Sequence, residues 1–489
     1  MQNEQTAQKP PYLMIVILFV GAFVAFLNNT LLNVALPTMM VDLNVDYTTI
    51  QWLANGYMLV SGVLTPASAY FITRYNTRPL FIVSTIIFVL GTLLAALAPV
   101  FGVLLAGRML QAVGASFMGP LLMNVMLISF PVEKRGAALG VFGLVMIAAP
   151  AIGPTLSGYI VEHHHWRVLF TMILPFAVVS LLLSIWKLKN VLPTRKVSLD
   201  YFSLVLSAIG FGGILYGFST SGDKGWSSPI VISALVIGVI GVVLFVLRQL
   251  KLESPVLDMG VFKSPMYALA AIISAVLSMA MMGGMILTPA YVQSVRGIEP
   301  FVSGLMMLPG ALVMAFMSPV TGKLFDKIGP KPLAIIGLSI MIVTTFMLSQ
   351  LNMDSSYLYI ISVFSVRALG IALVMMPIQT NGLNSLTAKL YPHGTASNNT
   401  ISQIAGAIGT AVLVSIMTAK STAVGEDLYA EAAANGTLTE EFMKTIQSQA
   451  LLEGIQLSFL VATIIAAIAF ILSLFLKRVV NPKNMKKAE

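Results

Sequence analysis

Residues Ser318 to Ile335 read SPVTGKLFDKIGPKPLAI, a charged turn between two long apolar runs. The same kind of turn occurs 253 positions earlier, where Thr65 to Ile82 read TPASAYFITRYNTRPLFI. The two copies share basic residues, prolines and a leucine in one register, namely Pro319 with Pro66, Lys327 with Arg74, Lys331 with Arg78, Pro332 with Pro79 and Leu333 with Leu80. So many matches in one register indicate an internal repeat.

The repeat extends beyond this turn. Matches at offsets of 257 to 259 positions are Arg367 with Arg108, Pro377 with Pro120 and Asn381 with Asn124. The chain is therefore predicted to consist of two related halves. Duplicated halves in a very apolar chain are typical of secondary transporters, whose halves move around a site near the middle of the bilayer.

Composition indicates an integral membrane protein, with the lipid bilayer as its surroundings. Of the 489 residues, 57% are apolar and 10% are charged, and the mean hydropathy is +0.90. A soluble domain carries about 25% charged residues. The net charge of +9 resides in short turns between apolar runs, which argues against nucleic-acid binding. The chain has no cysteine, so disulfides and thiolate metal sites are excluded.

Fourteen apolar runs are close to the ~20 residues that a spanning helix needs. Residues 1–190 are predicted to form a six-helix bundle, residues 191–264 two inserted helices with their linkers, and residues 265–489 a second six-helix bundle. The first helix is expected over residues 13–37. The polar stretch 421–450 is expected to be an outer loop with room for a short surface helix.

The distribution of basic residues predicts the orientation in the membrane. If the N-terminus is cytoplasmic, 21 of the 28 lysines and arginines fall on the inner side. Cytoplasmic loops carry an excess of these residues. Both termini are therefore expected to be cytoplasmic.

Several short motifs, in order along the chain, resemble the 14-helix drug:proton antiporters of the major facilitator superfamily, the QacA-like and EmrB-like exporters. They are Leu32 to Pro37 (LNVALP), the turn Arg74 to Pro79, Gly107 to Gln111 (GRMLQ), Pro150 to Thr155 (PAIGPT) and Trp166-Arg167. The resemblance implies a major facilitator fold and export of amphipathic small molecules in exchange for protons. It also implies a multi-pass, monomeric protein of the bacterial plasma membrane, with no cofactor and no metal.

The sequence departs from this family at informative positions. Asn28 stands where the family usually has an aspartate in its first helix. In the first copy of the turn, Thr73 and Asn76 replace an aspartate and a glycine, whereas the second copy keeps both as Asp326 and Gly329.

Arg108 is the first candidate for chemistry because a guanidinium inside a spanning helix costs roughly 2.5–3.5 kcal/mol unless it is paired or faces water. The resemblance implies that Arg108 and Gln111 govern proton movement and access of substrate. The alternative is that Arg108 only ties helices together through backbone carbonyls. Its repeat mate Arg367 is the weaker candidate.

No carboxylate falls near the centre of a predicted helix, so no residue is an obvious candidate for the acid that usually carries the proton. Asp42, just past the first predicted helix, is the first candidate for that role, and an exposed loop acid is the alternative. The resemblance implies that Asp326 is a gating acid, acting with the basic turn residues Arg74, Arg78, Lys327 and Lys331. Gly153 and Pro154 interrupt a helix and are candidates for a hinge.

The missing acids also bear on the cargo, because a buried dication needs compensating negative charge. Neutral, zwitterionic or monocationic amphipathic compounds are therefore expected. The predicted lining consists of amides and aromatic residues: Asn28, Asn33, Asn55, Tyr57, Asn124, Tyr291, Gln293, Gln379, Asn381, Asn398 and Gln403.

Two other functions are alternatives to drug export. An exporter of one physiological metabolite or lipid-like solute would have the same fold. A membrane enzyme or a non-transporting sensor is disfavoured, because the sequence shows neither converging catalytic groups nor an added soluble domain.

Overall fold

The computed structural model describes residues 12–45, 47–434 and 439–479, and these residues form helices and short connections without strands. The long helices are α1 (Tyr12–Asp42), α2 (Tyr47–Arg74), α3 (Thr77–Ala96), α4 (Phe101–Ser129), α5 (Arg135–His163), α6 (Val168–Lys187), α7 (Tyr201–Lys224), α8 (Pro229–Gln249), α9 (Pro265–Ala290), α10 (Pro300–Ile328), α11 (Pro330–Leu348), α12 (Tyr357–Asn384), α13 (Tyr391–Ala434) and α14 (Glu440–Ser473). Single-turn elements are η1 (Val132–Lys134), η2 (Met259–Lys263), η3 (Tyr291–Val295) and η4 (Ala388–Leu390).

Within the described residues, twelve helices are long and apolar enough to cross a membrane. The two long helices outside this set are α2 and α5. The predicted all-helical membrane architecture is confirmed, and the count of fourteen spans stays a prediction.

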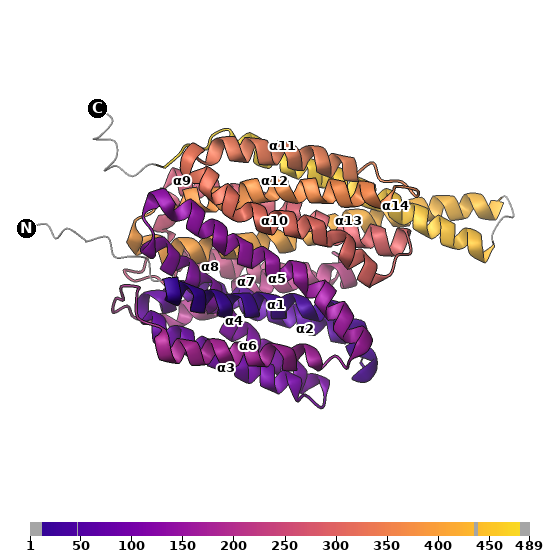
Figure 1. Ribbon diagram of the computed structural model, residues 1–489. Coiled ribbons are helices and arrows are strands. Elements are labelled where there is room, and N and C mark those ends of the chain that lie inside the picture. The colour runs from indigo at the N-terminus through magenta and orange to yellow at the C-terminus, as the bar shows by residue number, and fades with distance from the viewer. Residues whose placement is uncertain (1–11, 46, 435–438, 480–489) are drawn as a thin grey trace, which may run out of the picture.

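The helices form two bundles with a helical pair beside them (Figure 1). Helices α1 to α6 pack with one another, as do α9 to α14, and the two groups meet where α5 contacts α10 and where α2 contacts α13. Helices α7 and α8 pack tightly because Gly210 lies against the backbone of Gly241. Asp200 precedes α7, caps it at Ser203 and pairs with Arg248 of α8.

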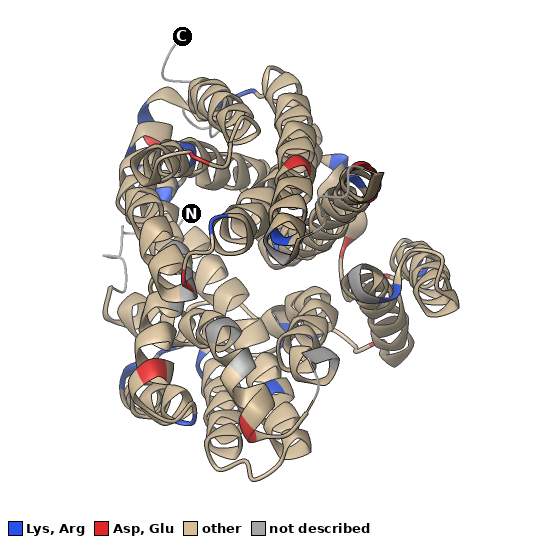
Figure 2. Ribbon diagram, turned by 90° about the vertical axis from the view of Figure 1, so that its right-hand side faces the viewer, with Lys and Arg blue, Asp and Glu red and all other residues tan. Residues whose placement is uncertain are grey.

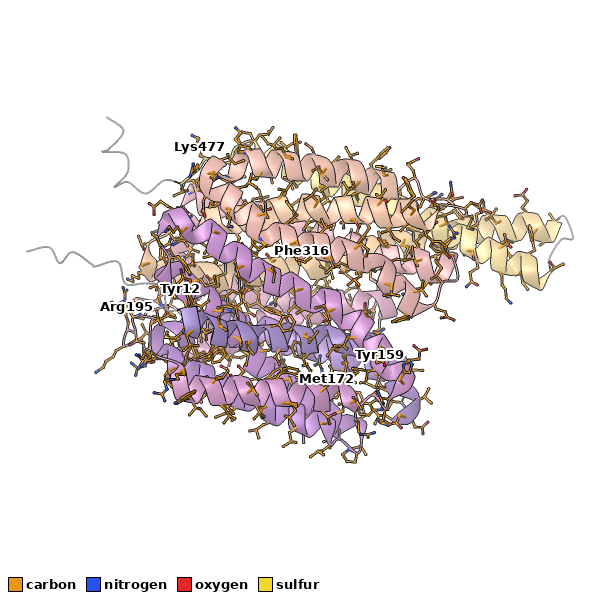
Figure 3. The ribbon with its side chains drawn as sticks, in the orientation of Figure 1. Tyr12, Tyr159, Met172, Arg195, Phe316 and Lys477 are labelled. Carbon is orange, nitrogen blue, oxygen red and sulfur yellow. The ribbon has the colours of Figure 1, made fainter. Side chains whose placement is uncertain are left out.

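The bundle has two distinct ends. Helix α1 begins and α14 ends at the same end, which we call the base, where Tyr12, Arg195 and Lys477 lie (Figure 3). Tyr159 lies at the opposite end, the tip (Figure 3). Viewed from the tip, charged residues are sparse along the helices, as membrane surroundings require (Figure 2).

The two copies of the repeated turn differ in backbone conformation. Gly329 ends α10 with φ +81°, a value that favours glycine, and Pro330 begins α11. In the first copy Asn76 has φ −62° and an extended ψ, which any residue adopts. The loss of glycine from the first copy is therefore accompanied by a different turn.

Two expectations about helix length were wrong. Helix α1 extends five residues beyond the predicted end at residue 37, so Asp42 is its last residue. The stretch 421–450 is not a loop with a short surface helix, because α13 continues to Ala434 and α14 starts at Glu440. These extensions project from the tip as a helical hairpin (Figure 1), and Glu453 lies within α14, 3.3 Å from Lys420 of α13.

Candidate functional site

Arg108 and Gln111 form a buried polar cluster on α4. Both side chains are fully buried, and Arg108 Nη1 donates to Gln111 Oε1 at 2.9 Å. The same oxygen accepts from Asn28 Nδ2 on α1 at 3.0 Å, while Gln111 Nε2 donates to Thr92 Oγ1 on α3 at 2.9 Å. The predicted pair therefore exists, and Asn28, at the position of the family's aspartate, is joined to it.

The guanidinium of Arg108 is incompletely satisfied. Its Nε donates to the Leu53 carbonyl at 3.4 Å, and its Cζ lies 4.5 Å from the centroid of the Tyr57 ring. Its Nη2 is buried without a hydrogen-bond partner, and no carboxylate among the described residues pairs with Arg108. A buried donor that lacks a hydrogen-bond partner is costly, which favours a functional role over simple tying of helices.

Arg367, the repeat mate of Arg108, has different surroundings. Its Nε donates to Thr345 Oγ1 at 3.1 Å and its Nη2 to the Ala280 carbonyl at 2.9 Å. It packs directly against Gly284. Arg367 therefore ties α9, α11 and α12 together, which is the structural role that the sequence left open for Arg108.

A second site lies at the base, where Asp326 of α10 reaches the start of α5. Its two carboxylate oxygens accept from the backbone amides of Gly136 and Ala137, each at 2.9 Å. The N-terminus of a helix is a favourable place for a negative charge. Farther along the same contact, Ser318 Oγ donates to the Gly140 carbonyl at 2.8 Å. The two bundles are thus closed against each other at the base.

Further contacts across this end reinforce the closure. Arg135 Nη1 donates to Asn384 Oδ1 at 3.1 Å and to the Tyr391 hydroxyl at 2.8 Å. Gln379 approaches Met123 Sδ at 3.6 Å. Sequence reasoning missed Arg135, although its place at the start of a helix that follows a charged turn was a usable signal.

The basic turn residues form no ion pair that the structure describes. Arg78 donates to the Ile185 carbonyl at 2.7 Å, and Lys327 and Lys331 are exposed. Arg74, at the end of α2, is half-buried. Arg478, which was not predicted, donates to the backbone carbonyls of Asp326 and Lys327.

Asp42 lies at the tip, among polar groups that stabilise its charge. Its Oδ2 accepts from Trp166 Nε1 at 2.9 Å and from Arg167 Nη1 at 3.2 Å, and His165 lies 3.6 Å away. The hydrogen bond from Trp166 and the nearby positive charges lower the pKa of Asp42. A lowered pKa favours a permanently ionised surface acid over a proton carrier at neutral pH.

A small cavity of about 30 Å³ lies between α9, α12 and α13. It brings together two of the predicted cargo-binding amides, Gln379 and Asn398. The rest of its lining consists of hydroxyl, thioether and aliphatic groups: Ser274, Leu277, Ser278, Met281, Met375 and Ser402. No described lining residue carries a formal charge.

The other predicted cargo-binding residues are dispersed. Asn55 lines a separate cavity between α2 and α7. Gln403 of α13 donates to Thr65 Oγ1 of α2 at 3.4 Å, across the seam between the bundles. Asn124 donates to the Pro120 carbonyl within its own helix.

Three more of them make contacts within the second bundle. The Tyr291 hydroxyl donates to the Asn352 carbonyl at 2.6 Å, Gln293 donates to Ser303, and Asn381 donates to the Lys477 carbonyl.

The proposed hinge residue Gly153 packs against Thr30 of α1. The side chains of Asn33 and Pro154 lie outside those that the structure describes.

Comparison with known proteins places this geometry in a family. A family model described as the Major Facilitator Superfamily matches residues 18–410. The chain is 47% identical over 420 residues to the uncharacterized MFS-type transporter YhcA of Bacillus subtilis, covering 86% of this chain and 79% of that protein. It is 45% identical over 464 residues to the lincomycin resistance protein LmrB of the same species, covering 94% and 95%.

A solved structure shows the same fold. The crystal structure of the human organic anion transporter MFSD10 matches with a TM-score of 0.63 at 13% sequence identity, covering 94% of this chain and 100% of that one. Together with the family match and the membrane-spanning helices, these likenesses confirm the resemblance found in the sequence motifs. The chain is therefore a multi-pass membrane transporter of the major facilitator superfamily.

Proposed function

We propose that this transporter exports amphipathic, neutral to monocationic compounds from the cytoplasm by alternating access, in exchange for protons. The observation that carries the proposal is the uncharged lining that brings Gln379 and Asn398 together beside Met281 and Met375, around a space that has to widen when the base opens. Amides and hydroxyls suit polar groups of a cargo, and flexible thioethers suit varied apolar surfaces. The name of LmrB, a lincomycin resistance protein, supports drug export.

The base is proposed to face the cytoplasm, as the distribution of basic residues predicts, so the structure corresponds to the state closed on that side. The hydrogen bonds of Asp326 to Gly136 and Ala137 would have to break before cargo could enter from the cytoplasm. In this account Asp326 is a latch between the halves and does not bind cargo.

Coupling to protons is assigned to the surroundings of Arg108. The Nη2 of Arg108 has no hydrogen-bond partner, and Arg108 shares the Oε1 of Gln111 with Asn28. The guanidinium is therefore free to exchange hydrogen-bond partners during the transport cycle.

The proposal includes fourteen spanning helices in a bacterial plasma membrane, with both termini cytoplasmic and the protein acting as a monomer.

Export of lincomycin and of the fluorescent monocation ethidium tests this function. Cells that produce the Gln379→Ala or Asn398→Ala variant should lose most resistance to lincomycin and most ethidium export. The matched control is Gln350→Ala, which removes an exposed amide bonded to Ser349, away from the cavity, and should keep both activities. If the cavity variants export as well as the wild type, the assignment of the cargo site is wrong.

A further inference from the structure

A second cavity, of about 90 Å³, lies between α2 and α7. Helix α2 belongs to the first bundle, whereas α7 is the first of the two inserted helices. The residues that line it are Trp52, Asn55, Met58, Leu59, Leu215, Tyr216, Ser219, Thr220 and Lys224. It shares no lining residue with the cavity around Gln379.

The lining changes from polar to apolar along α7. Lys224 is the last residue of α7 and therefore lies at the tip, where the membrane meets water. Leu215 lies nine residues earlier, which is about 13 Å deeper at 1.5 Å per residue. A ligand that fits both ends has a polar head and an apolar body.

The charge of the lining selects the head group. Lys224 is exposed, and no described residue forms an ion pair with it. The other eight lining residues are uncharged, so the described lining carries one positive charge and no negative one. A cationic head would be repelled, while a carboxylate or a phosphate would gain charge-assisted hydrogen bonds.

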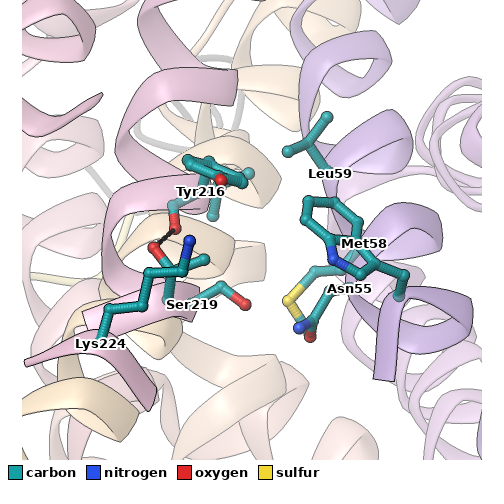
Figure 4. A pocket seen from close by; sticks show the side chains of 9 residues that line it. Asn55, Met58, Leu59, Tyr216, Ser219 and Lys224 are labelled. Atoms are coloured by element: carbon teal, nitrogen blue, oxygen red, sulfur yellow. Dashed lines mark hydrogen bonds between the residues drawn. The ribbon is translucent and has the colours of Figure 1, made fainter. Parts of the chain in front are cut away.

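Two aromatic rings of the lining, one from each helix, meet across this cavity. The rings of Trp52 on α2 and Tyr216 on α7 stack, with centroids 5.7 Å apart and planes 29° apart. Asn55 and Met58 lie across the cavity from Ser219 and Lys224 (Figure 4). The lining therefore offers aromatic surface next to amide and hydroxyl groups.

We propose that the cavity between α2 and α7 binds an anionic amphiphile, with its carboxylate or phosphate at Lys224 and its apolar body beside Trp52, Tyr216 and Leu215. Such a head group is found both on membrane phospholipids and on soluble single-chain amphiphiles. This site is distinct from the proposed cargo site and does not depend on the direction or coupling of transport.

The test measures binding of decyl phosphate to the purified full chain in phosphatidylcholine nanodiscs, followed by tryptophan fluorescence. The fluorescence change should saturate and should disappear in Trp52→Phe, which identifies the source of the signal. Lys224→Gln should weaken binding by about tenfold, the loss expected for one charge-assisted contact. Lys224→Arg should retain binding.

The control variant is Lys420→Gln, which removes another lysine near the tip, one that pairs with Glu453, and should leave binding unchanged. Decyltrimethylammonium, with the same chain and the opposite charge, should not bind, nor should inorganic phosphate alone. Phosphatidylglycerol in the nanodisc should weaken decyl phosphate binding if the natural occupant is a lipid, and should have no effect if it is a soluble amphiphile. Equal affinity of wild type and a folded Lys224→Gln variant, or equal binding of the cationic amphiphile, would overturn the proposal.

Discussion

The carboxylate of Asp326, near the end of α10, accepts a hydrogen bond at 2.9 Å from the backbone amide of Gly136, at the start of α5. These residues belong to different halves of the chain and are 190 positions apart. A second bond, to the amide of Ala137, makes the contact bidentate. Hydrogen bonds to a charged group contribute about 1.5–3 kcal/mol each, so this contact is strong enough to bias which side of the transporter is open.

Asp326→Asn should loosen the base, because the amide side chain lacks the charge that favours the α5 N-terminus. The chain has no cysteine, so a single Ser318→Cys substitution gives a clean probe of access to the contact between α5 and α10. A membrane-impermeant maleimide added from the base side should label this cysteine about tenfold faster when Asp326→Asn is also present, which corresponds to about 1.4 kcal/mol.

The control for this latch is Thr73→Ala at the equivalent position of the first copy. The Thr73 hydroxyl donates to the Ala69 carbonyl within its own helix, so its removal should leave the labelling rate unaltered. Equal labelling with and without Asp326→Asn would show that the latch does not hold the base closed.

Arg108→Lys should abolish export although it keeps the positive charge. A lysine lacks the planar guanidinium of Arg108, whose nitrogens donate to the Leu53 carbonyl and to Gln111 while the group lies over the Tyr57 ring. Arg367→Lys should lower the melting temperature but leave export per folded molecule close to wild type. Ethidium export normalised to the amount of folded protein distinguishes these outcomes, and export by Arg108→Lys at the wild-type rate would refute the assigned role.

Asn398→Asp should extend the range of cargo towards dications. The substitution places a carboxylate in the cavity beside Gln379, where the structure has only uncharged groups. A buried negative charge compensates for a second positive charge on the cargo. Competition of a dicationic and a monocationic dye for export measures the preference, and an unchanged ratio would contradict this explanation of cargo charge.

Asp200 should make stability depend on acid pH. The hydrogen bond from Arg248, aided by Ser203, lowers the pKa of Asp200 from 3.8 to about 2. The stabilisation is therefore complete above the unfolded-state pKa near 4 and is lost as the pH falls through the folded value near 2. Asp200→Asn should lower the melting temperature equally at pH 6 and pH 8, and the difference from wild type should narrow below pH 4. A constant difference down to pH 2 would argue against this ion pair.

Much of the fold could be predicted because membrane helices leave a strong signal in sequence. Long apolar runs and the repeat around Asp326 sufficed for the all-helical architecture. The hairpin of α13 and α14 was missed because its polar residues end the hydropathy signal while the backbone remains helical. Hydropathy indicates whether a segment is surrounded by lipid or by water. It does not indicate where the helix ends.

The candidate site was predicted only in part for a similar reason. Arg108 and Gln111 are three residues apart on one helix, so their contact follows from helical geometry. The bonds of Asp326 to Gly136, and of Arg135 to Tyr391, join the two halves and depend on how the bundles dock. Likewise, Tyr291 bonds to Asn352, a contact that residue type alone does not reveal.

The most direct test of the central claim is uptake of ethidium into inverted membrane vesicles, with and without an imposed pH gradient. Wild type and Asp42→Asn should both show uptake that requires the gradient, because Asp42 is held ionised at the tip, whereas Arg108→Lys should show none. Wild-type uptake that is the same with and without the gradient would contradict proton-driven export and would point to another ion or to facilitated diffusion.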